Sequence, residues 1–136
     1  MARQASLLMA DEIYYNLYGK AILQGVYQGD IRIPTDPSFS HQFIFYFMAE
    51  TDSTDPFRSL VAEVTLPGNP TVREVVGLIP PEVIKNASKE ARAFYRHPLL
   101  VRTPTLRPGR IEAKMIHESG EIIVGAPSIL LIPNPS

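Results

Sequence analysis

The three histidines are the side chains best suited to acid–base chemistry near neutral pH. His41 follows Ser40, His97 stands further along the chain, and His117 precedes Glu118. A hydrolase needs a serine or threonine beside a histidine, and an acid that orients that histidine. None of the three lies in a Gly-x-Ser-x-Gly turn. A small hydrolase or ligand-binding enzyme that uses a loop histidine with nearby acids is therefore the alternative function, and no catalytic residue is assigned.

Acidic residues offer one possible metal site, in the loop that carries Glu50, Asp52 and Asp55. Carboxylates suit calcium, but the Asp-x-Asp-x-Asp-Gly spacing is absent, so a solvated polar loop is the preferred interpretation. His117 and Glu118 would point to opposite faces of a strand and would make poor co-ligands. The chain has no cysteine, which excludes disulfides, thiolate catalysis and Cys-ligated zinc. No metal and no cofactor is expected.

Basic residues concentrate in residues 85–114, which carry eight Lys and Arg against two acids, whereas residues 1–84 carry five against ten. Such an excess could form a face for an anionic partner. The segment lacks the interleaved aromatics of a nucleic-acid groove, so we favour solvated strand and turn positions and expect no nucleic-acid partner. The stretch "RPGR" at 107–110 could hold an anion between two guanidinium groups, but a Pro-Gly turn is favoured.

The composition indicates one folded domain spanning residues 1–136, with 45% apolar and 20% charged residues. The 13 prolines, about twice the usual ~5%, fall between apolar runs and punctuate them. No window approaches the ~20 apolar residues of a spanning helix. Asp11 and Glu12 interrupt the apolar patch of the N-terminal segment, which is therefore a poor signal peptide. No membrane contact is expected, and a cytoplasmic location is the default.

Short apolar runs separated by turn residues predict a mainly β fold. In residues 111–115 apolar and charged side chains alternate, and "ESGE" at 118–121 predicts a hairpin turn before a return strand. Residues 6–15 predict one strand that ends in a turn at 16–19. Gly25, within the next apolar run, indicates a bulge or a close backbone approach.

The helical candidate is Pro81–Tyr95, where Pro81 and Glu82 form a favourable helix start and apolar residues recur every three to four positions. The predicted fold class is therefore a single antiparallel β-sandwich of about eight strands, with at most one short helix near 81–95.

Four stretches together resemble a bacterial family of short uncharacterised proteins, a domain of unknown function: "ADEIYYNLYGK", "GVYQGDIRIP", "EVTLPG" and "LRPGRIEAKMIHESGEI". The resemblance covers nearly the whole chain and implies a single antiparallel β-sandwich. It implies no activity, cofactor or catalytic residue.

The stretch "HQFIFYFMAE", residues 41–50, predicts a strand that is apolar on both faces. A sandwich core explains only one such face, because the opposite face of a sandwich strand usually meets water. The other face needs cover, and its residues make a candidate interface. That candidate interface comprises Phe43, Phe45 and Phe47 on one face and Ile44, Tyr46 and Met48 on the other.

Two covers for the second face are possible. Residues 81–95 could fold over it with Val83, Ile84 and Phe94, or a second copy or another protein could pack there. Further tyrosines suit a surface that is apolar at one end and wet at the other: Tyr14, Tyr15, Tyr18 and Tyr27. The primary functional hypothesis is accordingly a non-enzymatic binding or assembly module, with a protein partner or a homo-oligomer.

Overall fold

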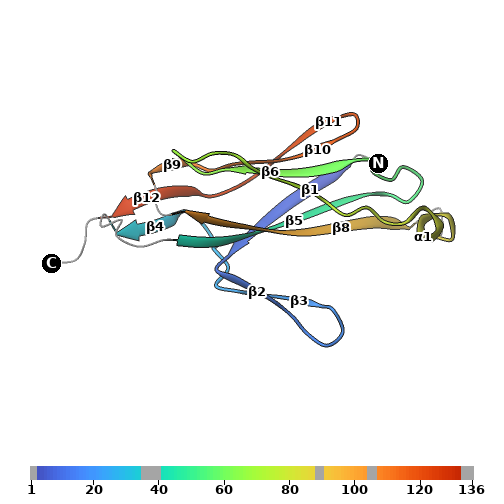
Figure 1. Cartoon of the computed structure of the whole chain (residues 1–136), viewed down its shortest axis with the longest axis horizontal. Helices are drawn as coiled ribbons and strands as arrows, with labels where there is room; N and C mark the ends of the chain where they lie inside the picture. The colour runs from blue at the N-terminus through green and yellow to red at the C-terminus, as the bar shows by residue number, and fades with distance from the viewer. Residues whose placement is uncertain (1–2, 35–40, 88–90, 104–106, 133–136) are drawn as a thin grey trace.

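The computed structural model describes residues 3–34, 41–87, 91–103 and 107–132, and the secondary structure of this part of the chain consists of strands and one short helix. Short runs of β-branched and aromatic residues fit a pleated, half-buried surface, which explains why they form strands here. The predicted mainly β class is confirmed: two antiparallel sheets face each other, as in a β-sandwich (Figure 1).

The first layer is a three-stranded sheet in which the long strand β5 lies between two neighbours and pairs antiparallel with both. Phe47 lies opposite Leu7 on one side and His97 on the other. The strands, in spatial order, are β1 (Gln4–Ala10), β5 (His41–Asp52) and β8 (Arg92–Thr103).

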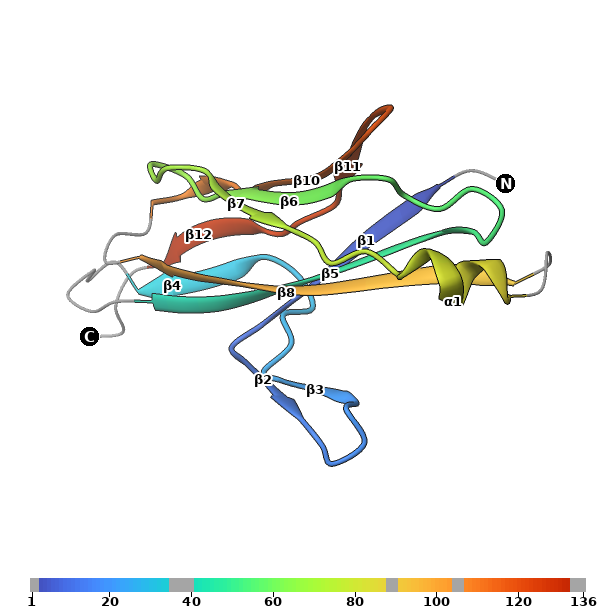
Figure 2. The same cartoon turned by 45° about the vertical axis from the view of Figure 1, so that its right-hand side comes forward.

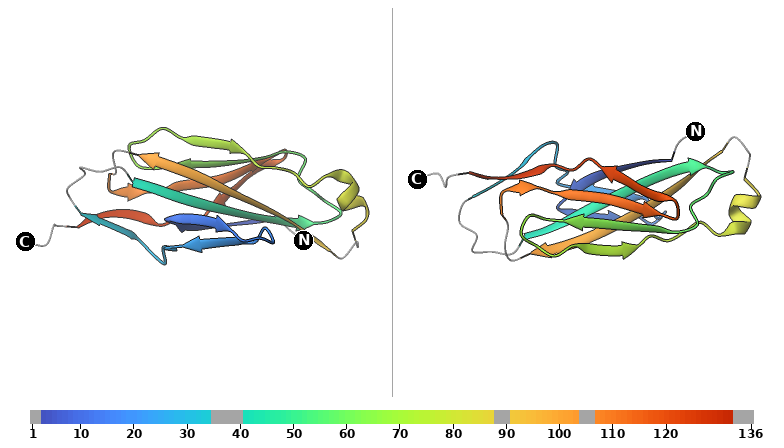
Figure 3. Two further views of the ribbon diagram at one scale, coloured as in Figure 1. Left: turned by 60° about the horizontal axis from the view of Figure 1, so that its bottom comes forward. Right: turned by 90° about the horizontal axis from the view of Figure 1, so that it is seen from above.

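The second layer is a four-stranded antiparallel sheet that lies over the first when the molecule is seen from above (Figure 3). Its order is β11 (Gly120–Val124), β10 (Glu112–His117), β6 (Leu60–Thr65) and β7 (Val72–Val75). The predicted alternation is confirmed, because Ala113 and Met115 are buried while Glu112 is exposed. The hairpin predicted at 118–121 joins β10 to β11.

One strand pair departs from the antiparallel prediction. Strand β12 (Ser128–Ile132) runs parallel to β4 (Ile31–Pro34) and antiparallel to the short β9 (Gly109–Arg110). Parallel pairing needs a long connection, and the chain between β4 and β12 includes most of the two layers. Neither the sequence of β4 nor that of β12 contains a local pattern that indicates this parallel pairing.

The N-terminal run predicted as one strand is divided at Asp11. After β1 the chain leaves the sheet and forms a separate hairpin, β2 (Glu12–Tyr15) with β3 (Ala21–Gln24), which projects from the body of the molecule (Figure 2). The turn predicted at 16–19 lies at its tip. Gly25 confirms the predicted close approach: it has φ +71°, and a side chain there would collide with Asp11.

The single described helix, α1 (Pro81–Lys85), begins at the predicted proline but is much shorter than 81–95. Strand β8 already begins at Arg92, where pairing with β5 buries Ala93 and Tyr95 in the core. Strand pairing and burial therefore override the helical spacing of these residues. Among the described residues, no helix is long and apolar enough to cross a membrane.

The core fills the space between the two layers, and three phenylalanines of β5 stand at its centre. Phe43 is 2% exposed, and Phe45 and Phe47 are fully buried. The Phe43 ring packs edge-on against Tyr27 at 5.9 Å and Phe45 at 6.5 Å, separations typical of favourable aromatic pairs. Burying each phenylalanine stabilises the fold by about 1.5–3 kcal/mol.

Candidate interaction surface

The structure separates the six residues of the candidate interface by strand face. Phe43, Phe45 and Phe47 belong to the core between the layers, so they are not available to a partner. Ile44, on the opposite face, is also buried, at 6% exposure. Only Tyr46 and Met48 are partly exposed. The candidate interface is thereby corrected to residues on one face of the first sheet.

We define the outer face as the side of the first sheet that points away from the second layer. Cross-strand register places Ser6, Met48 and Arg96 in one row of this face. The apolar side chains of the outer face are Leu8 and Ala10 of β1, Ile44, Tyr46 and Met48 of β5, and Phe94 and Leu100 of β8. Three of these stay substantially exposed: Leu8 at 40%, Leu100 at 42% and Phe94 at 53%.

The β2–β3 hairpin covers part of the outer face, because β2 contacts β5. Of the two faces of the hairpin, the one that carries Ile13, Ala21 and Leu23 is half-buried. Tyr15 lies on this same face near Tyr46: partial burial, and secondarily Tyr46, raise the pKa of Tyr15. The second apolar face of β5 therefore has an internal cover that reaches only part of it.

The prediction that residues 81–95 cover this face is wrong. Helix α1 lies at one end of the molecule and buries none of its residues, and Val83 is 57% exposed (Figure 1). Phe94 belongs to β8 and is itself an exposed part of the outer face. The segment cannot act as one cover because its second half is a strand of the sheet.

The base of the hairpin is fixed to the body by polar contacts. The Tyr27 hydroxyl donates a 2.6 Å hydrogen bond to Asp11 Oδ1, and the Tyr27 N–H donates to the Met9 carbonyl at 2.9 Å. Burial, followed by the bond to the Asp11 carboxylate, raises the pKa of Tyr27 well above its ordinary value. The Asp11 N–H donates to the Gln24 carbonyl at 3.1 Å, which ties the start of β2 to the end of β3.

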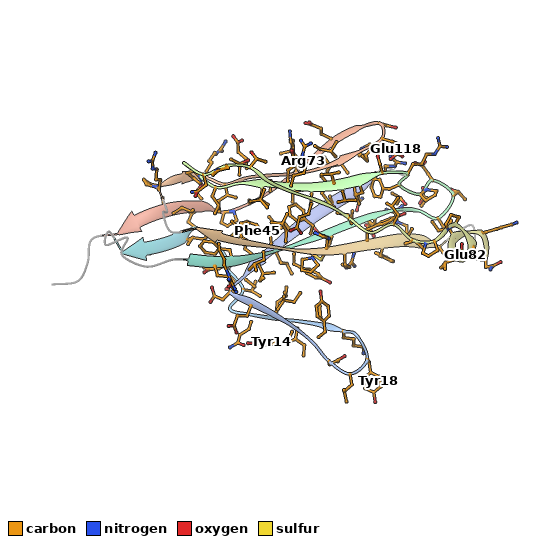
Figure 4. The ribbon with its side chains drawn as sticks, viewed as in Figure 1. Tyr14, Tyr18, Phe45, Arg73, Glu82 and Glu118 are labelled. Atoms are coloured by element: carbon orange, nitrogen blue, oxygen red, sulfur yellow. The ribbon has the colours of Figure 1, made fainter. Side chains whose placement is uncertain are left out.

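The tip of the hairpin is an ordered turn with exposed apolar side chains. Asn16 Oδ1 accepts hydrogen bonds from the N–H groups of Tyr18 (2.9 Å) and Lys20 (3.0 Å), and Gly19 supplies a positive φ of +74°. This turn holds Leu17 fully exposed and Tyr18 87% exposed, with Tyr18 pointing away from the body (Figure 4). Large apolar side chains displayed on an ordered turn are typical of contact surfaces.

A hollow of about 240 Å³ lies on the outer face at the end of the sheet nearest α1. Eight residues of β1, β5 and β8 line it: Gln4, Ala5, Ser6, Met48, Ala49, Glu50, Phe94 and Arg96. The Arg96 guanidinium lies 5.3 Å from the centre of the Phe94 ring. The lining of the hollow thus combines an apolar side chain, an aromatic ring, one cation and one carboxylate, a combination that suits a single aromatic or aliphatic side chain with a polar neighbour.

A second and larger hollow, about 770 Å³, opens on the second layer beside β10. Its lining mixes signs of charge: Glu63, Glu112 and Asp30 oppose Lys114 and Arg110. Glu63 is 6% exposed and is neutralised by Arg73 and by Lys114, whose ammonium lies 3.6 Å from Glu63 Oε2. These contacts explain the buried carboxylate as part of the sheet surface.

The two histidines whose side chains are described, His97 and His117, do not gather in one place. His97 Nε2 lies 2.7 Å from Glu74 Oε1 and joins β8 to β7 across the two layers. His117 Nδ1 lies 2.9 Å from the guanidinium of Arg3, at the end of β10. The side chain of His41 lies outside the described residues. The arrangement required by the hydrolase alternative, two histidines with one acid, is therefore not formed by His97 and His117.

His117 belongs to an ion cluster around Arg3 at the β10–β11 turn. The Arg3 guanidinium lies 2.6 Å from Glu118 and 3.3 Å from Asp55, and stacks 4.6 Å above the Phe57 ring. Burial opposes ionisation of Glu118, but hydrogen bonds from backbone N–H groups and Arg3 outweigh it and lower the pKa of Glu118 to about 2. The cluster ties the start of β1 to two loops.

The acids suggested as calcium ligands are divided between two arginines. Arg92 lies 2.6 Å from Asp52 and 3.6 Å from Glu50, whereas Asp55 pairs with Arg3. Among residues 3–34, 41–87, 91–103 and 107–132, no group of three His, Cys, Asp or Glu side chains forms a metal site.

No protein-family model, curated protein or solved structure matches the chain. The resemblance to a family of uncharacterised bacterial proteins therefore stays a prediction. The sequence suggested Tyr14, Tyr15, Tyr18 and Tyr27 as an extension of this surface. The first three are exposed, whereas Tyr27 is half-buried and packs against Phe43. The sequence did not identify the hairpin that carries Tyr14, Tyr15 and Tyr18. The available signal was the turn at 16–19 between two apolar runs, bounded by Asp11 and Gly25.

Proposed function

We propose that the protein is a non-enzymatic binding or assembly module, and that it associates with further copies of itself through the outer face and the β2–β3 hairpin. The observation that carries this proposal is the exposure of Leu17 and Tyr18 on a turn held by Asn16. An ordered turn that keeps its largest apolar side chains in water gains free energy when another surface covers them.

The free energies of burial and association indicate that the interface must include more than the hairpin tip. Burying one large apolar side chain contributes about 1.5–3 kcal/mol, whereas association costs an estimated 4–15 kcal/mol in lost rigid-body freedom. Leu17 and Tyr18 of one copy together contribute about 3–6 kcal/mol, which falls short of most of that range. Leu8, Phe94 and Leu100, which lie on the same side of the molecule, must also contribute area.

The test is a measurement of molar mass by size-exclusion chromatography with light scattering, over protein concentrations from micromolar to millimolar. We expect the mass to rise with concentration from one chain to two. A mass that stays at one chain over the whole range would contradict self-association. Circular dichroism at each concentration is the control that the chain stays folded.

A further inference from the structure

We propose that self-association is a two-fold exchange in which the hairpin tip of each copy, Leu17 and Tyr18, fills the 240 Å³ hollow on the outer face of the other copy. This inference rests on the self-association proposed above. It adds which surfaces meet, which residue enters the hollow and which charges pair.

The first support is that the hollow is empty of the chain's own hairpin. Tyr18 is 87% exposed and Phe94, on the wall of the hollow, is 53% exposed, so neither covers the other. The hairpin diverges from the sheet toward its tip (Figures 1 and 4), and the residues that line the hollow lie on the outer face, which the hairpin partly covers. The hydrogen bond between Tyr27 and Asp11 fixes the base of the hairpin, and the hairpin projects away from the body (Figure 2).

The second support is chemical complementarity between tip and hollow. Met48 contributes an apolar side chain to the lining of the hollow, and Arg96 contributes a guanidinium group that lies 5.3 Å from the centre of the Phe94 ring. A tyrosine ring suits both, because its face attracts a cation while its hydroxyl stays in water. A hollow of this volume admits one such side chain.

The third support is charge and spacing. The ammonium of Lys20, two residues beyond Tyr18, forms no ion pair among the described residues, and Glu50 on the rim of the hollow has only a long 3.6 Å contact with Arg92. Glu50 and Arg96 are diagonal neighbours on β5 and β8, about 7–8 Å apart by strand geometry. Tyr18 and Lys20 stand two residues apart on one turn, so their side chains can reach Arg96 and Glu50 of the other copy together.

These observations favour a second copy as the occupant over a different protein. One face of the chain carries both the projecting tip and the hollow that fits it, which is the self-complementarity that a two-fold interface requires. Each contact then forms twice. Leu8 and Leu100, on the same face, add apolar area between the two sheets.

The first experiment weakens the tip. Tyr18→Glu and Leu17→Glu are each expected to raise the dimer dissociation constant at least tenfold in sedimentation equilibrium, without changing the thermal midpoint of the monomer. Val83→Glu, which alters an apolar residue on α1 that is 57% exposed, is the matched control and is expected to leave the constant unchanged.

The second experiment reverses charges. Lys20→Glu is expected to weaken the dimer, and the double variant Lys20→Glu/Glu50→Lys is expected to restore it, because the pair reforms with opposite signs. Lys85→Glu on α1 is the control for a general change in net charge.

The third experiment uses the absence of cysteine from the chain. Equal amounts of Tyr18→Cys and Ser6→Cys, carrying tags of different length, are mixed under mild oxidation. Ser6 lines the hollow, so a mixed disulfide-linked dimer is expected on a non-reducing gel. Ser119→Cys, at the β10–β11 turn, replaces Ser6→Cys in the control and is expected to give no mixed dimer.

The outcomes separate the two proposals. A wild-type chain that is a strict monomer overturns self-association and this inference together. A dimer that survives both tip variants and gives no Tyr18–Ser6 cross-link overturns the hairpin exchange but leaves self-association standing through another surface.

Discussion

The two faces of β5 are equally apolar in sequence and have opposite environments in the structure. Phe43, Phe45 and Phe47 are sealed between two sheets, whereas the face with Tyr46 and Met48 meets a hairpin that covers it only in part. Both faces bury apolar surface. The first face is covered by strands that pair in a continuous second sheet, whereas the second face is covered in part by the hairpin. An apolar strand face therefore indicates that a cover exists, and the identity of that cover depends on segments far away in the chain.

The same contrast holds between the body and the hairpin. The body is held by aromatic packing, inter-sheet pairs such as His97–Glu74 and the Arg3 cluster. The hairpin is held at its base by Asp11 and Tyr27, and its tip contacts none of these groups. We expect changes in the body to alter global stability and changes in the hairpin tip to alter association.

The largest expected effect is in the core. Phe45→Ala removes a fully buried ring and should lower the free energy of unfolding by about 3–5 kcal/mol, because a cavity remains between the sheets. Tyr18→Ala, which removes an aromatic ring of similar size in water, should change it by less than about 0.5 kcal/mol. Urea unfolding of both variants measures the difference. Similar losses in the two would mean that the tip packs against its own chain.

The base of the hairpin should show an intermediate effect. Gly25→Ala places a side chain at φ +71° and against Asp11, and should destabilise the fold by about 1–2 kcal/mol. Gly19→Ala has a similar φ of +74° but open space around the added carbon, so it isolates the backbone cost. Amide hydrogen exchange should show faster opening of β2 and β3 in Gly25→Ala than in Gly19→Ala. Equal exchange would show that the contact with Asp11 is unimportant.

A smaller effect is expected from the anchor of the hairpin. Tyr27→Phe keeps the ring on Phe43 and removes the hydrogen bond to Asp11, which should cost about 1 kcal/mol because the pair is partly open to water. The loss should appear as faster exchange at β2 and β3 with little change in the unfolding midpoint of the body. A uniform loss across both sheets would show that the anchor belongs to the cooperative core.

Much of the fold is predictable from the sequence because it depends on local periodicity. The alternation at 111–115, the hairpin turn after it and the proline that begins α1 are all properties of short segments. The helical spacing of residues 92–95 predicts the wrong structure, because these residues pair with β5 as part of β8. The parallel pairing of β12 with β4 and the cover over Tyr46 depend on contacts between distant segments, which no local pattern reports.

The weakest expected effect is the acid response of the Arg3 cluster, because Glu118 is 22% exposed and water screens its ion pair. Its pKa is lowered from 4.5 to about 2, so the charged carboxylate stabilises the folded state fully above pH 4.5. That contribution is lost as pH falls from 4.5 toward 2, since the unfolded chain binds the proton first. Glu118→Gln should therefore unfold more easily than wild type at pH 7, and the difference should shrink toward pH 2. Thermal unfolding of both proteins at several pH values measures this convergence. A constant difference would show that Glu118 acts through hydrogen bonds that glutamine cannot make, independently of its charge.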